Sequence, residues 1–121
     1  MADAAVMTRD TQGGAAIDRR HLARMTLGDR SLEREVLQLF DRQAAMLIVR
    51  IRASSPAAIA SLAHTLKGSA AGIGADAVAL SADATELAAD GPPSECVQAI
   101  DRLAAAVDEA RALIAELLRE V

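Results

Sequence analysis

The stretch SPAAIASLAHTLKGSAAGIG, residues 55–74, predicts the helix on which the rest of the fold is built. It opens with Ser55-Pro56, a start signal because proline fits the first helical position and a serine hydroxyl can cap it. It closes at Gly74, which can end a helix in the left-handed conformation. Between these signals, apolar residues recur at steps of three and four and predict a buried stripe. The stripe consists of Ile59, Leu62, Ala63, Leu66, Ala70 and Ile73.

Lys67 is the only lysine in a chain that otherwise uses twelve arginines for positive charge. It follows His64, one of only two histidines, by three residues, and positions i and i+3 are neighbours on one helix face. An imidazole is therefore predicted to lie beside a compact ammonium, with Gly68 one turn beyond it. This combination suits a histidine that carries a phosphoryl group, because an ammonium can neutralise phosphoryl oxygens.

His64 is predicted to face away from the core. At about 100° per residue, it falls on the order of 150° from the centre of the apolar stripe. Ala60, Lys67, Gly68 and Ala71 lie on the same side. Gly68 costs about 1 kcal/mol of helix stability relative to alanine, and Gly72 adds a similar cost. A functional reason is steric clearance for a partner; close helix packing and an ordinary solvated face stay open as alternatives.

Four further helices are predicted. A short one follows Asp18, its N-cap, and a long one runs from about Ser31 to Ala53. A third is capped by Asp76, and a fourth starts at Ser94 after Gly91-Pro92-Pro93. The positions expected to be buried on these helices are Leu22, Met25, Val36, Leu37, Phe40, Ala44, Leu47, Ile48, Ile51, Leu80, Ala84, Leu87, Val97, Ile100, Leu103, Val107, Ile114 and Leu117.

Composition favours an all-α fold. The chain of 121 residues is 52% hydrophobic but contains one Phe and no Tyr or Trp, so alanine and aliphatic residues must fill the core. Such residues favour closely packed helices over sheet. Four long helices joined by short loops predict an antiparallel up-and-down bundle, with the short N-terminal helix covering one end. Residues 1–16 are predicted to be a flexible tail, and residues 17–121 a single domain.

Several function classes are disfavoured by the sequence. A net charge of −4 without a basic patch argues against nucleic acid as a partner. Two distant histidines and one cysteine, Cys96, make no metal-ligand cluster and no internal disulfide. No hydrolytic constellation, signal peptide or membrane-length apolar run is visible. We therefore expect a cytoplasmic protein without a metal or cofactor of its own, and, because one chain supplies four core-lined helices, a monomer. His21 is expected to be an ordinary surface residue, and Cys96 a structural one.

The residues along one side of the long helix predict a docking surface for a partner. Leu39 and Met46 flank the buried stripe there and can form a partly exposed apolar patch. Gln43 and Arg50 lie on the same side, where either side chain can reach a phosphate. The alternative is that Leu39 and Met46 pack against a neighbouring helix. Ala60 and Ala71 would extend the surface beside His64.

The pattern His64-x-x-Lys67-Gly68-Ser69-Ala70-x-x-x-Gly74-Ala75 resembles the motif of histidine-containing phosphotransfer (HPt) domains of bacterial multistep phosphorelays. Gly28-Asp29, followed by a long helix, is similar to the usual start of such domains, so the resemblance covers about residues 17–121. It implies a four-helix bundle whose exposed histidine, His64, accepts a phosphoryl group from an aspartyl phosphate on a receiver domain.

The resemblance also assigns roles and partners. It implies that Lys67 assists the phosphate and that Gly68 provides clearance. It further implies that the protein is a phosphocarrier without an ATP site, and that the receiver domain supplies the divalent cation. The partners would be receiver domains of a hybrid histidine kinase or of a response regulator. Around His64 this chain departs from many family members, because its surface there is mostly alanine.

Two other functions remain open from the sequence. One is a degenerate dimerising phosphoacceptor module of the histidine-kinase type, which four core-lined helices in one chain argue against. The other is a helical adaptor without phosphorylation, in which His64 is incidental.

Overall fold

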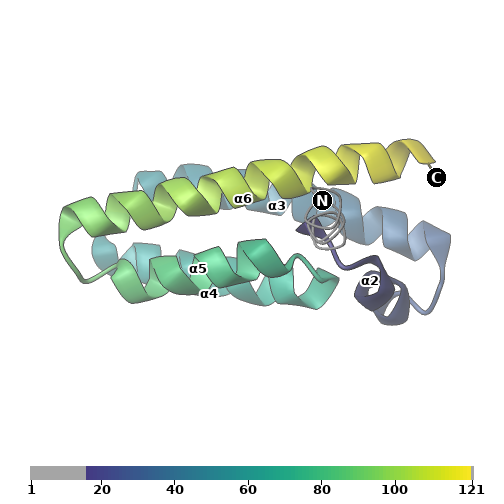
Figure 1. Cartoon of the computed structure of the whole chain (residues 1–121), viewed down its shortest axis with the longest axis horizontal. Coiled ribbons are helices and arrows are strands. Elements are labelled where there is room, and N and C mark those ends of the chain that lie inside the picture. Colours follow the sequence, from purple (N-terminus) through teal and green to yellow (C-terminus); the bar gives the residue numbers. More distant parts are fainter. Residues whose placement is uncertain (1–15, 121) are drawn as a thin grey trace, which may run out of the picture.

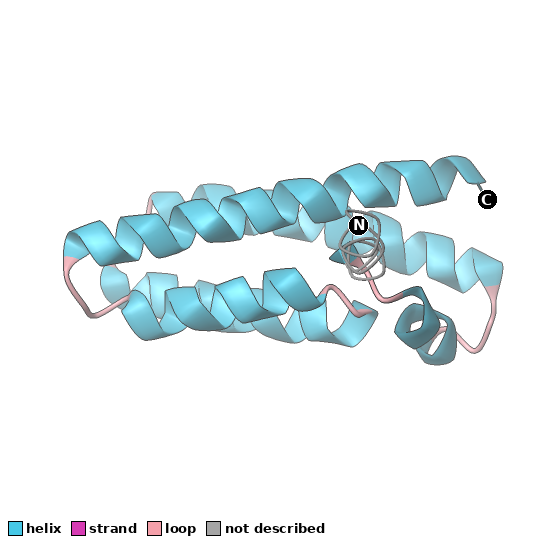
Figure 2. Cartoon of the chain, in the orientation of Figure 1, coloured by secondary structure: helices cyan, strands magenta, loops and turns pink. Residues whose placement is uncertain are grey.

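The computed structural model describes residues 16–120 and is built from helices joined by short turns (Figure 1, Figure 2). This part of the chain contains no strand, which confirms the predicted all-α class. The predicted tail, residues 1–16, lies outside the described residues apart from Ala16. The helices are α2 (Arg19–Met25), α3 (Arg30–Arg52), α4 (Pro56–Ile73), α5 (Asp76–Ala88) and α6 (Pro93–Glu120).

The four long helices enclose one core. α4 packs against α3 and α5, and α6 packs against the same two helices, so each long helix has two long neighbours. Figure 1 shows these helices lying along the long axis of the molecule, with α2 near one end. The α4–α5 contact is the most extensive of all, and α2 packs against α4. The largest fully buried side chains include Ile17, Leu22, Leu37, Ile51, Leu66, Leu103 and Ile114.

Carboxylates cap the first two helices. Asp18 Oδ1 accepts hydrogen bonds from the backbone N–H groups of Arg20, at 3.0 Å, and His21, at 3.1 Å, which confirms Asp18 as the N-cap of α2. Asp29 Oδ1 accepts from the backbone N–H of Leu32 at 3.0 Å. This cap starts α3 at Arg30, one residue before the predicted start.

The boundaries of α4 agree with the prediction, although one cap does not. Pro56 is the first residue, and Gly74 ends the helix in the left-handed conformation at φ 81°. The hydroxyl of Ser55, however, makes no capping hydrogen bond, so the start rests on proline alone. All six positions of the predicted stripe are buried or half-buried.

The buried face of α5 differs from the prediction. We expected Leu80, Ala84 and Leu87 to be buried, but all three are exposed, Leu80 at 73% and Leu87 at 77%. Small residues face the core instead, namely Val78, Ala82 and Thr85. The physical reason is that small side chains let α5 approach α4 and α6 closely, as two leucines would not. The buried Thr85 hydroxyl is satisfied by the carbonyls of Ser81, at 2.9 Å, and Ala99, at 3.3 Å.

Other expectations about single positions are also wrong. Met25 and Val97 were expected inside, but both are more than half exposed. Asp76 is the first residue of α5 and makes no side-chain cap, because Ala75 occupies the N-cap. The last helix begins at Pro93 rather than Ser94, since proline is favoured at the first helical position.

Gly74 joins α2 to the α4–α5 turn. Its carbonyl accepts a hydrogen bond from the backbone N–H of Asp18 at 2.8 Å. A Cβ at Gly74 would lie 2.9 Å from the carbonyl oxygen of Asp18, which is too close for any real side chain. Position 74 therefore requires glycine for two reasons, the positive φ and the approach of the Asp18 backbone.

We expect Gly74→Ala to lower the free energy of unfolding by more than the ~1–2 kcal/mol that a left-handed alanine costs. Gly28→Ala is the matched control, because Gly28 has a similar φ of 73° but nothing within 4 Å of its Cβ position. Urea unfolding followed by far-UV circular dichroism measures both losses. Equal losses in the two variants would contradict the proposed clash with Asp18.

Candidate functional site

His64 stands in the middle of α4 with 67% of its side chain exposed, so the predicted outward orientation is correct. Its Nδ1 lies 3.2 Å from Oε1 of Glu86 on α5. A carboxylate can only accept, so Nδ1 donates the hydrogen bond. The neutral ring then keeps its lone pair on Nε2, the nitrogen that Glu86 does not engage.

Lys67 meets two carboxylates of α5. Its Nζ lies 3.0 Å from Oδ1 of Asp83 and 3.4 Å from Oε1 of Glu86. Glu86 therefore pairs with both His64 and Lys67, whereas Asp83 forms an ion pair with Lys67 alone among the described residues. We refer to His64, Lys67, Asp83 and Glu86 as the α4–α5 charge cluster.

The contacts within the α4–α5 charge cluster shift two pKa values. The hydrogen bond from His64, supported by Lys67, lowers the pKa of Glu86 against the opposing effect of partial burial. The hydrogen bond to Asp83, with a further contribution from Glu86, raises the pKa of Lys67. Both groups are therefore held in their charged forms. With a neutral imidazole, two carboxylates and one ammonium leave the cluster with a net charge of −1.

The two glycines inside α4, Gly68 and, in the last turn, Gly72, are not explained by helix packing. A Cβ placed at Gly68 or at Gly72 would meet no atom within 4 Å outside the helix's own nearby backbone. Close packing against another described helix, the alternative left open by the sequence, is therefore excluded for both. No side chain therefore projects from the surface of α4 at these two positions.

His21 is not the ordinary surface residue that we expected. It is half-buried, and its Nε2 lies 3.1 Å from the carbonyl oxygen of Gly72. Because a carbonyl oxygen only accepts, Nε2 must donate. His21 thus links α2 to the end of α4. Cys96, in contrast, is buried near the start of α6, as expected of a structural cysteine.

A shallow hollow surrounds His64. Its lining comes from α4 and from Glu86 of α5. Ala60 belongs to this lining and is half-buried, whereas Ala71 is exposed further along the same helix. The other α4 residues of the lining are Ala57, Ser61, His64 and Thr65.

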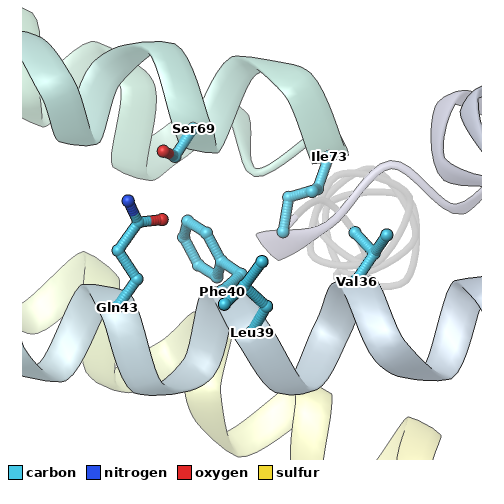
Figure 3. Close-up of a pocket in the computed structure, with 6 residues that line it drawn as sticks. All are labelled: Val36, Leu39, Phe40, Gln43, Ser69 and Ile73. Atoms are coloured by element: carbon cyan, nitrogen blue, oxygen red, sulfur yellow. The ribbon is translucent and has the colours of Figure 1, made fainter.

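Leu39 and Met46 are exposed at 59% and 51%, so they do not pack into a neighbouring helix of the described chain. Together with Arg42 and Gln43 they line a hollow on α3. A second hollow lies between α3 and α4, where Gln43 is directed toward Ser69 (Figure 3). Leu39 and Gln43 line both hollows, which extends the predicted apolar surface up to α4.

Asp83 and Glu86 were not identified from the sequence. Their spacing of three residues repeats that of His64 and Lys67 one helix earlier, and this was the available signal. The prediction that Leu80, Ala84 and Leu87 face the core assigned the wrong rotation to α5. Asp83 and Glu86 were therefore not recognised as a pair that faces α4. No group of three or more potential metal ligands occurs within residues 16–120, and no helix there is long and apolar enough to cross a membrane.

We expect the two histidine rings to hold opposite tautomers when neutral. His64 should carry its proton on Nδ1 and His21 on Nε2, because their acceptors contact those nitrogens. Long-range ¹H–¹⁵N correlation spectra distinguish the two patterns, and the chain has only these two histidines. Glu86→Ala should remove the Nδ1 preference of His64 and leave His21 unchanged. The same tautomer in both wild-type rings would contradict the assigned hydrogen bonds.

We expect the contribution of Glu86 to stability to depend on pH. Its pKa is lower in the folded chain than the ordinary value of 4.5, so the unfolded chain binds the proton more tightly. The stabilisation is therefore complete above the ordinary pKa and is lost as the pH falls through the lowered one. The difference in unfolding free energy between wild type and Glu86→Gln should shrink over that range. Glu116→Gln, with no ion-pair partner in the described part, is the control; a constant difference for Glu86→Gln would contradict the shift.

Comparison with known proteins identifies the family of this chain. A family model described as "Hpt domain" matches residues 33–113, from the first turn of α3 to the last third of α6. The match includes the whole α4–α5 charge cluster but not α2. No curated protein and no solved structure matches the chain. Because the family model covers more than half of the sequence, the chain belongs to the Hpt domain family, the phosphocarrier domains that perform histidine phosphotransfer in phosphorelays.

Proposed function

We propose that His64 is the phosphoacceptor, and that it takes a phosphoryl group from the aspartyl phosphate of a receiver domain and passes it on to, or drains it from, a response regulator. The observation that carries this proposal is the hydrogen bond between His64 Nδ1 and Glu86. It fixes the ring on an exposed helix face and leaves the lone pair on Nε2. Nε2 is therefore the nitrogen that we propose becomes phosphorylated.

The transfer step follows from this geometry. The Nε2 lone pair attacks phosphorus, an N–P bond forms, and the P–O bond to the aspartyl carboxyl breaks as that carboxylate leaves. The imidazole gains positive charge during the step, and Glu86 faces the Nδ1–H that shares this charge. Lys67 supplies a movable point charge to the phosphoryl oxygens. The divalent cation would be held by the receiver domain.

The surface around His64 supports a protein as the phosphoryl donor. The open space over Gly68 and Gly72 lets another backbone approach the imidazole. Leu39, Gln43 and Met46 on α3 would supply docking contacts, with Ala60 and Ala71 completing the surface on α4. The neighbour relations of the four long helices support an antiparallel up-and-down bundle formed by one chain, and hence a monomer.

We expect phosphorylated receiver domains of the same organism to transfer label to wild type and to His21→Gln, with complete loss in His64→Gln. His21→Gln is the matched control, because it alters the other histidine and a glutamine can still donate to Gly72. The label should be acid-labile and base-stable, as a phosphoramidate is. Label on His64→Gln, or no label from any receiver domain, would overturn the proposal. In the second case a helical adaptor becomes the better account.

A further inference from the structure

Asp83 pairs with the Lys67 ammonium, the group that the phosphoryl oxygens would need. The distance from Lys67 Nζ to Asp83 is 3.0 Å, shorter than the 3.4 Å to Glu86. The side chain of Asp83 makes no hydrogen bond to His64, whereas Glu86 does. In the unphosphorylated protein the ammonium therefore already has a carboxylate partner that plays no part in orienting the imidazole.

Phosphorylation would place more negative charge beside this pair. A phosphoryl group on histidine brings up to about two negative charges at neutral pH, as phosphorylated side chains do. The α4–α5 charge cluster already has a net charge of −1 when the ring is neutral. An ammonium has three N–H donors, and two face Asp83 and Glu86. One donor remains for the phosphoryl oxygens, which must share the positive charge of Lys67 with both carboxylates or displace one of them.

We propose that Asp83 competes with the phosphoryl group for Lys67, destabilises the phosphohistidine and thereby drives the phosphoryl group onward to a receiver domain. This inference rests on the proposed function of His64. Asp83 is then a positioning residue that acts through Lys67 and touches no reacting atom. It shifts the transfer equilibrium toward the receiver domain.

The structure holds Asp83 in place for this role. The neighbouring Thr85 is fully buried, and its hydroxyl bonds to the carbonyl of Ala99 on α6. Ala82, on the other side, is also fully buried. With α5 fixed on both sides, Asp83 remains opposite Lys67 when the ammonium turns away. The carboxylate can therefore recapture Lys67 as soon as the phosphoryl group leaves.

The test is the equilibrium between phosphorylated His64 and one receiver domain that exchanges phosphoryl groups with it. Wild type, Asp83→Asn, Asp83→Glu and Asp90→Asn are each charged first with phosphoramidate. In that step Nε2 attacks phosphorus, the bond from phosphorus to the protonated nitrogen of phosphoramidate breaks, and ammonia leaves. Receiver domain and Mg²⁺ are then added, and the fraction of label remaining on His64 at equilibrium is measured. This ratio depends on the relative stabilities of the two phosphorylated proteins and not on the rate of transfer, so a variant that only slows transfer would not mimic the expected change.

We expect Asp83→Asn to shift the equilibrium constant toward phosphohistidine by about two- to fivefold, the range typical of exposed ion pairs. Asp83→Glu should restore the wild-type ratio. Asp90→Asn, which removes the same charge from a position outside the α4–α5 charge cluster, should leave the ratio unchanged. In a Lys67→Met background, Asp83→Asn should have no further effect.

The possible failures are distinguishable. If wild type accepts and exchanges label on His64 but Asp83→Asn gives the wild-type ratio, the competition is overturned and the proposed function stands. A shift that persists in the Lys67→Met background overturns the competition in favour of direct repulsion. If phosphoramidate and every receiver domain leave wild-type His64 unlabelled, both the proposed function and this inference are overturned.

Discussion

The close packing of α5 on α4 is the constraint on which the site depends. Ala63 and Ala70 on α4, and Ala82 on α5, are completely buried, and these two helices share the most extensive contact in the fold. Small side chains at such a contact allow a short distance between helix axes. The short carboxylates of Asp83 and Glu86 can therefore reach Lys67 and His64 directly. A larger residue at Ala82 would move α5 outward and separate the charged groups.

The limits of prediction are clearest on α5. Hydrophobicity alone favours Leu80 and Leu87 as buried residues, and their spacing of seven fits a helix face. The opposite face, with Ala82 and Thr85, looks weaker because alanine is small and threonine is polar. Packing reverses this order, since α5 has two long helices close by and the Thr85 hydroxyl finds carbonyl acceptors. Such a choice depends on neighbours that a single helix pattern does not contain.

In the site, too, some features follow from a single helix pattern and others depend on neighbouring helices. His64, Lys67 and Gly68 lie within five residues of one helix, so their shared face and outward direction follow from helical geometry. Glu86 and Asp83 lie on the next helix, and their contacts depend on how α5 is rotated about its own axis. The link between His21 and Gly72 spans 51 residues and depends on how α2 docks. Chemistry within one helix was predictable, whereas chemistry between helices required the fold.

The clearance role proposed for Gly68 and Gly72 would set helix stability against partner access at the surface of α4. No described neighbour would clash with a Cβ at either glycine, so alanine at either position would make the helix more stable on its own. A thermostability screen, or a redesign scored on folding alone, would therefore enrich alanine at both positions. Under the proposed clearance role, only a selection carried out with the partner protein present would keep the glycines. Their retention in an evolved library would thus report whether the His64 face was being used.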